Sequence, residues 1–282
     1  MRHLLLGSVA LLGLAAASAQ AADLPRRAAP MAPVYAVPIF TWTGFYVGAN
    51  IGYGWGQSKT RTFLDPTSSW AVEAPAFQAG WAALSNGTTN PSGILGGAQI
   101  GYNYQMNSFV AGLEVDINAA GIKGNSTTFG APTPPGPPTY TWMRSAKTDW
   151  FLTVRPRLGV TFDRTLVYIT GGLAVGGVKG DWSVLGSNGY SKGASFSRTK
   201  TGWTIGGGVE QAITENWSIK LEYLYTDLGR VDYASFYRPG STFAPPGANY
   251  RELLSQDFKF HTVRVGLNYR FGGPAGAVVA KY

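Results

Sequence analysis

The 282-residue chain contains no cysteine, which excludes disulfide bridges, thiolate metal sites and cysteine nucleophiles together. Charge is also scarce, since Asp, Glu, Lys and Arg make up only 13% of the residues. A typical soluble domain carries about 25%. After residue 21 no stretch is apolar over the roughly 18 positions that a transmembrane helix needs, so a helical membrane protein is excluded. The 38 glycines follow no three-residue period, which excludes a collagen-like chain.

The N-terminal residues have the features of a secretory signal peptide, which we assign to residues 1–21. Arg2 gives a basic start, Leu4 to Ala17 form an apolar stretch, and Ala19-Gln20-Ala21 is a small-x-small cleavage site. Residues 22–39 are rich in Ala and Pro, which favours an extended and flexible lead-in. We therefore expect one folded domain over residues 40–271, followed by a C-terminal tail over residues 272–282.

From Phe45 onward the chain alternates with a period of two residues. In the first segment Phe45, Val47 and Ile51 occupy one face, while the other face is mostly Gly or polar. This alternation predicts β-strands. Each segment has about ten residues, the length with which a tilted strand crosses a bilayer. The predicted strands are 45–56, 94–105, 109–118, 150–162, 167–175, 203–210, 217–225 and 263–271.

The connections between these segments alternate in length. Short turns at 106–108, 163–164 and 214–216 are separated by long polar stretches at 57–92, 121–148, 179–199 and 230–256. Short turns on one side and long loops on the other are typical of outer-membrane barrels. The predicted fold is all-β, an eight-stranded antiparallel up-and-down transmembrane β-barrel with both ends in the periplasm. The alternative is a soluble secreted β domain.

Aromatic residues distinguish these two possibilities, because a membrane barrel carries a ring of them at each interface. We expect an outer girdle at the long-loop ends, formed by Tyr53, Trp55, Trp150, Trp203, Tyr223 and Tyr225. A periplasmic girdle at the short-turn ends would contain Tyr102, Tyr104, Phe109, Phe162, Trp217, Tyr269 and Phe271. Two belts favour the membrane barrel. Phe258 and Phe260 share the parity of the polar Arg264, and we expect them to stand above the membrane or to follow a bulge.

Several stretches also carry a resemblance when taken as a set. They are FTWTGFYVGANIGYGWG (40–56), GGAQIGYNYQ (96–105), GLEVDINAAG (112–121), TVRPRLG (153–159), TGGLAVG (170–176), GWTIGGGVE (202–210), NWSIKLEYLYTDLG (216–229) and HTVRVGLNYRF (261–271). Together they resemble the porin-like outer-membrane β-barrel family of Gram-negative bacteria, the group of the major outer-membrane immunogenic and hemin-binding proteins. The resemblance implies a barrel like the membrane domain of outer membrane protein A. The family's final aromatic matches Phe271, but Gly272 to Tyr282 follow it, which leaves Phe271 and Tyr282 as alternative assembly signals.

Charges on the polar face give the main clue to mechanism. An eight-stranded barrel has room inside for side chains and little else. We expect a paired network that plugs the lumen, in which Glu210 faces Lys220 and Glu222 neighbours Arg264. Scattered charges in a wet lumen are the alternative. The predicted network contains Glu114, Asp116, Arg155, Arg157, Glu210, Lys220, Glu222, Arg264 and Arg270.

The expected function is that of an integral outer-membrane protein with a structural or surface role and, at most, narrow porin-like conduction. We predict no enzyme, cofactor or metal site. A lipid-modifying enzyme is a remote alternative, because His261 is the only histidine after the signal peptide and Val263 stands where a His-x-Ser pair would need its serine.

Binding through the extracellular loops is the other alternative. Basic residues near the outer belt are expected to engage lipopolysaccharide phosphates. Hemin is a second possible ligand, through Tyr140, Tyr190, Tyr237, Tyr250 and His261. The barrel-assembly machinery and outer-membrane lipid are the other expected partners, and no nucleic acid is expected. The basic residues near the outer belt that could engage these phosphates are Lys59, Arg61, Lys123, Arg144, Lys147, Lys179, Lys192, Arg198, Lys200, Arg230, Arg238, Arg251 and Lys259.

Overall fold

The computed structural model describes residues 40–133, 138–242 and 247–271. The predicted signal peptide, the lead-in and the C-terminal tail, with its candidate assembly residue Tyr282, lie outside these residues. The described residues belong to one compact unit.

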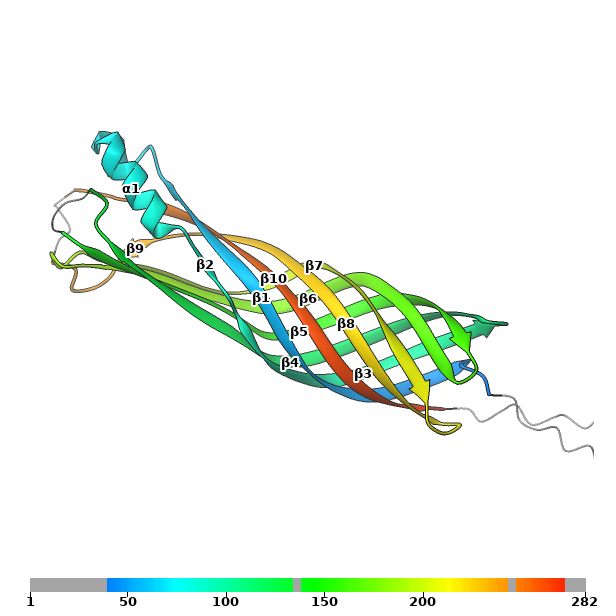
Figure 1. Ribbon diagram of the computed structural model, residues 1–282. Coiled ribbons are helices and arrows are strands. Elements are labelled where there is room, and N and C mark those ends of the chain that lie inside the picture. Colours follow the sequence, from blue (N-terminus) through cyan, green and yellow to red (C-terminus); the bar gives the residue numbers. More distant parts are fainter. Residues whose placement is uncertain (1–39, 134–137, 243–246, 272–282) are drawn as a thin grey trace, which may run out of the picture. The chain divides into compact units, whose positions relative to one another are not determined.

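Eight long antiparallel strands close into a ring, as predicted (Figure 1). Each strand pairs with its neighbours in the ring, and β10 pairs with β1 from Tyr46↔Arg270 to Leu64↔Glu252 to close it. Two short strands, β2 (Gly87–Thr89) and β9 (Phe236–Tyr237), pair with β1 and β7. In ring order the long strands are β1 (Gly44–Leu64), β3 (Ser92–Met106), β4 (Phe109–Gly130), β5 (Tyr140–Phe162), β6 (Thr165–Gly186), β7 (Ser191–Ala212), β8 (Trp217–Ala234) and β10 (Glu252–Arg270).

Tight turns join the strands at one end of the barrel. Asn107 and Asp163 adopt φ of 55° and 54°, the left-handed conformation that two-residue hairpins require and that Asn and Asp tolerate well. The ladder between β7 and β8, which the third tight turn at 214–216 joins, is shorter than the other ladders between long strands. β7 and β8 pair only from Trp203↔Asp227 down to Ala212↔Ser218, and beyond Trp203 β7 stays with β6 while β8 stays with β10.

The strands are much longer than the ten residues predicted, and this part of the prediction was wrong. Most of 121–148 and 179–199, predicted as loops, continues β4, β5, β6 and β7 as paired strands, with register shifts at Ala119/Ile122 and Thr148/Trp150. Above the apolar band the outward side chains become polar, as at Lys123, Asn125 and Lys179. The apolar alternation therefore stops there, although the backbone pairing does not.

The predicted loop 57–92 holds further structure. It contains the end of β1, a 3-10 turn η1 (Ser69–Val72), helix α1 (Pro75–Ser85) and β2. Pro75 begins the helix, where its missing N–H costs nothing. Figure 1 shows α1 at the end of the barrel away from the tight turns. Over the part of the chain that the structure describes, no helix is long and apolar enough to cross a membrane.

The barrel interior is filled with side chains in successive zones. Beside the tight turns, Trp42, Val110, Leu166, Tyr168 and Ala212 form a small apolar cluster. The charged residues follow, and then an apolar layer whose larger members are Leu95, Ile122, Phe151, Val178, Leu228, Val231, Phe258 and Phe260. At the far end a mouth cluster gathers Trp70, Trp81, Tyr140, Trp142, Trp182, Val184, Tyr190 and Leu254.

Phe258 and Phe260 therefore point into the barrel. A register shift between Asp257 and Lys259 marks the expected bulge beside them. Both rings are buried, and Phe260 keeps the inward parity that it shares with Arg264. An apolar layer inside the barrel was not predicted, although the parity of Phe260 already placed its ring inward.

Candidate functional site: a charged layer across the lumen

Eight of the nine predicted lumen charges form one buried layer, which we call the charged layer. The inward face of five strands supplies it: β4, β5, β7, β8 and β10. Each member is at most 3% exposed. The charge of each side chain is therefore balanced by neighbouring side chains and not by water. The members are Glu114, Asp116, Arg155, Arg157, Glu210, Lys220, Glu222 and Arg264.

Strand register brings acids and bases face to face. Glu114 lies opposite Arg155, and Glu222 lies opposite Arg264. Both pairs are in contact, with Arg155 Nη2 at 2.7 Å from Glu114 Oε1 and Arg264 Nε at 2.7 Å from Glu222 Oε2.

Glu210 also lies opposite Lys220, as predicted, but these two residues are not ion-paired. Glu210 instead binds Arg157 at 2.7 Å, and the Nζ atom of Lys220 lies 2.8 Å from both oxygens of Glu114. Register thus predicts which residues share a level. It does not predict the partner, because long side chains reach past their neighbours.

Several of these contacts cross the lumen. β4 and β8 stand opposite each other in the ring, so the Lys220–Glu114 pair spans its width. Arg264 on β10 reaches Asp116 on β4 at 2.8 Å. A barrel of eight strands is narrow enough for side chains from opposite walls to meet.

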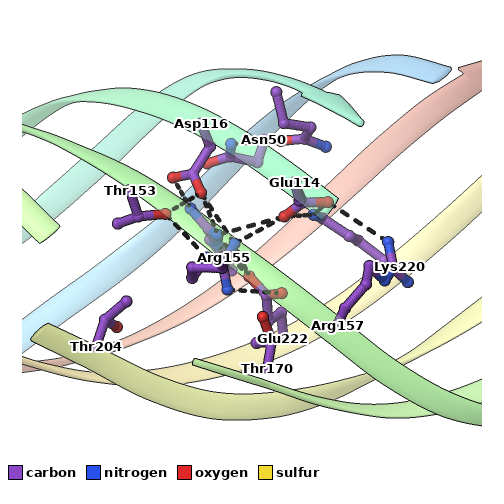
Figure 2. A network of polar contacts seen from close by, with 12 residues as sticks. Asn50, Glu114, Asp116, Thr153, Arg155, Arg157, Thr170, Thr204, Lys220 and Glu222 are labelled. Carbon is purple, nitrogen blue, oxygen red and sulfur yellow. Dashed lines mark hydrogen bonds and ion pairs between the residues drawn. The ribbon is translucent and has the colours of Figure 1, made fainter. Parts of the chain in front are cut away.

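Arg155 is the centre of the layer (Figure 2). Its guanidinium contacts Glu114 at 2.7 Å, Asp116 at 2.9 Å and Glu222 at 3.2 Å, and its Nε atom donates to Thr153 Oγ1 at 2.8 Å. A planar guanidinium can serve several carboxylates at once, which a lysine ammonium does less well. Arg155 therefore joins acids from two walls of the barrel.

Arg270 is the exception among the predicted lumen charges. It lies at the tight-turn end, where its guanidinium donates to the backbone carbonyls of Thr41 and Glu215 and packs over the Phe40 ring at 4.5 Å. Among the described residues it makes no ion pair. Its inward parity was read correctly, but its level along the strand separates it from the layer.

Two tyrosines complete the layer and were not predicted as members. Tyr46 donates to Glu114 at 2.7 Å and accepts from Arg157 at 2.9 Å, while Tyr168 donates to Glu222 at 2.8 Å. The Arg157 guanidinium also lies 3.9 Å from the centre of the Tyr168 ring. Both tyrosines carry the inward parity, which was the available signal. Gly101 makes room for one of them, since a Cβ there would lie 2.4 Å from the Tyr46 ring.

The apolar layer lies directly above the charged one. Phe151 on β5 meets Phe260 on β10 with ring centres 5.4 Å apart. These strands are also opposite each other in the ring, so this contact crosses the lumen as well. Higher still, Gln256 on β10 donates to the carbonyl of Ser145 on β5 at 3.0 Å.

The predicted girdle residues lie on the outer face of the barrel. Tyr225 and Tyr269 are half-buried there, and the other members of both girdles are exposed. The outer girdle does not mark strand ends, however. β1 continues to Leu64 beyond Trp55, and β5 begins at Tyr140, before Trp150. The ring therefore encircles the middle of the long strands.

His261 belongs to this outer girdle. Its Nδ1 atom lies 2.6 Å from Tyr223 Oη, and its ring stacks on Trp55 at 5.8 Å. Ser255 donates to Asp232 instead, and Asp257 accepts from the backbone of Lys59. None of these contacts assembles a Ser, His and acid unit.

The four loop tyrosines gather at the mouth, away from His261. Tyr190 lies 5.8 Å from Tyr140 and 5.6 Å from Tyr237, while Tyr250 packs against Trp70. Burial raises the pKa of Tyr190 far above its usual value, and a hydrogen bond to Glu73 raises that of Tyr250 to about 12. Iron ligation needs the phenolate form, so these shifts work against it.

Two residues predicted as surface bases are buried at the mouth instead. Lys192 pairs with Glu252, and its Nζ atom also donates to the Tyr250 carbonyl. Arg144 donates to the carbonyls of Leu84 and Ser85 at 2.5 and 2.9 Å, and to Thr128 at 3.0 Å. Both lie in stretches that the sequence predicts as loops. They point inward because the strands continue through these stretches.

Comparison with known proteins gives a consistent result. The family described as "Outer membrane protein beta-barrel domain" matches residues 7–271. The 31 kDa outer-membrane immunogenic protein of Brucella melitensis is 39% identical over 274 residues, which cover 96% of this chain and 100% of that protein. The 25 kDa outer-membrane immunogenic protein of the same organism is 28% identical over 96% and 99% of the two chains. The crystal structure of Ail from Yersinia pestis matches with a TM-score of 0.30 and 15% identity, over 81% of this chain and 99% of that one.

Proposed function

The chain belongs to the outer membrane protein beta-barrel domain family, and we propose that it is a closed barrel with a surface role rather than a diffusion pore. One observation carries the proposal: two different layers fill the same lumen, each with contacts between opposite strands. These are the Lys220–Glu114 pair in the charged layer and the Phe151–Phe260 contact in the apolar layer.

The apolar layer is the stronger argument against conduction. A charged lumen alone could pass ions if its pairs rearranged, since Glu114, Asp116 and Glu222 each contact more than one base. An ion that also has to cross Phe151 and Phe260 would lose its hydration without gaining polar partners, which is costly.

The surface role rests on the region above the outer girdle. Helix α1, η1 and the continued strands form a structured outer end in place of simple loops. The Brucella relatives are named for their immunogenicity, and we extend that property to this chain as part of the proposal.

Planar-bilayer recording of the folded, full-length protein tests the proposal. We expect no reproducible current steps from the wild type, with folding verified by heat-modifiable migration on a gel. Reproducible steps of constant size would make the protein a narrow porin and overturn the closed-barrel proposal.

Variants of the two layers provide the control. Arg155→Ala should remain silent, because the apolar layer is intact, and Phe151→Ala/Phe260→Ala should remain silent because the charged layer is intact. Only the combined variant, if folded, should conduct. Conduction by Arg155→Ala alone would show that the apolar layer does not block the lumen.

A further inference from the structure

We propose that the outer wall between β1, β10 and β8 binds the phosphate groups of a phosphorylated glycolipid of the outer leaflet, of the lipid A class. The site is a basic groove defined by Lys59, Arg61, Arg230 and Lys259. It lies on the outer surface of the barrel, so it is independent of whether the lumen is closed.

Three neighbouring strands bring the four bases together. On β1 and β10, Gln57 pairs with Lys259 and Arg61 with Ser255; between β10 and β8, Asp257 pairs with Arg230. All four side chains line one hollow of about 940 Å³, together with Asn90, Ser92 and Asp257. The hollow is large enough for a sugar phosphate.

The groove carries unneutralised positive charge. Among the described residues, Lys59, Arg61 and Arg230 have no ion pair and no side-chain hydrogen bond. Lys259 is the exception, with Nζ 3.2 Å from Asp227 Oδ2. Asp257 also lines the hollow and accepts from the backbone N–H of Lys59 at 2.7 Å. Its charge and that of Asp227 offset two of the four positive charges, so the groove stays net positive. Bases held close together repel one another, and an anion between them would relieve this repulsion.

The surroundings of the groove match the parts of a glycolipid in the right order. Immediately below the bases, His261 lies between Trp55 at 5.8 Å and Tyr225 at 5.1 Å, which forms an aromatic platform at headgroup depth. Below the platform the outward face is apolar, with Ile51 67% exposed. Acyl chains, sugars and phosphates would meet apolar, aromatic and basic surfaces in turn.

Another pair of bases on the barrel wall is neutralised by an acid and supplies a control. Lys147 and Lys179 lie on β5 and β6, just above Trp150 of the outer girdle. Both pair with Asp149, at 2.5 and 2.8 Å. Their charge is therefore partly neutralised, and they should contribute little to phosphate binding.

The experiment measures binding of dansyl-labelled lipid A to the folded, full-length protein in phosphatidylcholine vesicles, by energy transfer from tryptophan. Dephosphorylated lipid A serves as the matched ligand. We expect Lys59→Ala/Arg61→Ala/Arg230→Ala to weaken lipid A binding by about tenfold or more, since charge-assisted hydrogen bonds to phosphate are lost. Lys147→Ala/Lys179→Ala should bind as the wild type does, with heat-modifiable migration checking that both variants fold.

Three results would overturn the proposal. Equal affinity for lipid A and its dephosphorylated form would remove the phosphate from recognition. Equal weakening by the two sets of substitutions would reduce the groove to general surface charge. Displacement of lipid A by millimolar inorganic phosphate would indicate a site for free anions instead of a glycolipid.

Discussion

At the scale of single residues, the charged layer depends on one arginine more than on any other. Arg155 touches three carboxylates that have been taken out of water. A buried network of this kind adds little net stability over an apolar core, but removing one member leaves opposite charges without partners. The stability of the barrel therefore depends on every member of the network being present.

Arg155→Ala should lower the free energy of unfolding by about 3–5 kcal/mol. Urea denaturation followed by heat-modifiable gel migration measures this loss. Arg198→Ala is the control, because Arg198 is exposed and makes only a 3.4 Å contact with the Asp232 carbonyl. An Arg155→Ala barrel as resistant as this control would refute the paired network.

The second residue-scale prediction concerns Lys192 and Glu252, which lie at the outer strand ends beyond the membrane-spanning segments. Burial raises the pKa of Glu252 and lowers that of Lys192, so both charged forms are disfavoured there. Lys192→Met removes the only base paired with Glu252 among the described residues. The variant should lose about 3–5 kcal/mol at neutral pH.

The pH dependence of this variant has a definite sign. A raised carboxyl pKa contributes stability that is present below the unfolded value, about 4.3, and is lost as pH rises through the folded value. Lys192→Met should therefore recover stability as pH falls from neutral toward that range. Lys192→Met/Glu252→Gln should be close to wild type at all these values. Denaturation of both variants at several pH values tests the pair, and a pH-independent loss in the single variant would contradict it.

At the scale of elements, α1 is attached to the barrel by a side chain of another strand. Arg144 on β5 donates to the last carbonyls of the helix, where a positive charge also interacts well with the helix dipole. Trp81 anchors the same helix against Trp142, with ring centres 5.2 Å apart. The helix is thus held at its end and along one face.

Arg144→Met should loosen α1 without unfolding the barrel. The lost hydrogen bonds to a charged group correspond to about 2 kcal/mol or more, so cleavage within 65–91 by a nonspecific protease should become faster. Lys147→Met, on the same strand but half exposed, is the control. Unchanged cleavage in Arg144→Met would mean that other contacts of the helix, such as that of Trp81, hold it without Arg144.

At the scale of the barrel, buried and surface charges should respond differently to salt. In a closed barrel, as we propose, the buried charged layer is out of reach of ions, whereas the basic groove is exposed to them. Screening over a Debye length of about 10 Å at 0.1 M affects only exposed charges strongly. The denaturation midpoint should therefore change little between about 0.05 and 0.5 M salt, while lipid A binding should weaken. A marked fall in the midpoint would mean that water and ions reach the charged layer.

The sequence by itself determined the barrel. Alternation of the kind seen from Phe45 to Trp55 occurs in eight segments, separated in turn by long polar stretches and tight turns. It defines the strand number, and within these segments parity assigns each side chain to the lumen or to the lipid. The inward placement of Arg155, Glu222 and Arg264 follows from that parity alone. These properties are local, because between bulges a side chain's face depends only on its position along its own strand.

Only the tertiary structure decided which side chains meet inside the lumen and where the strands end. The Phe151–Phe260 contact and the exchange of partners around Glu210 and Lys220 join opposite or next-nearest strands, and no local pattern records such distances. Lys192 and Arg144 appeared to be surface charges because the outer strands lose their apolar alternation. Their backbone pairing continues nonetheless, since hydrogen bonds in a ladder do not require apolar side chains, and it turns both residues inward.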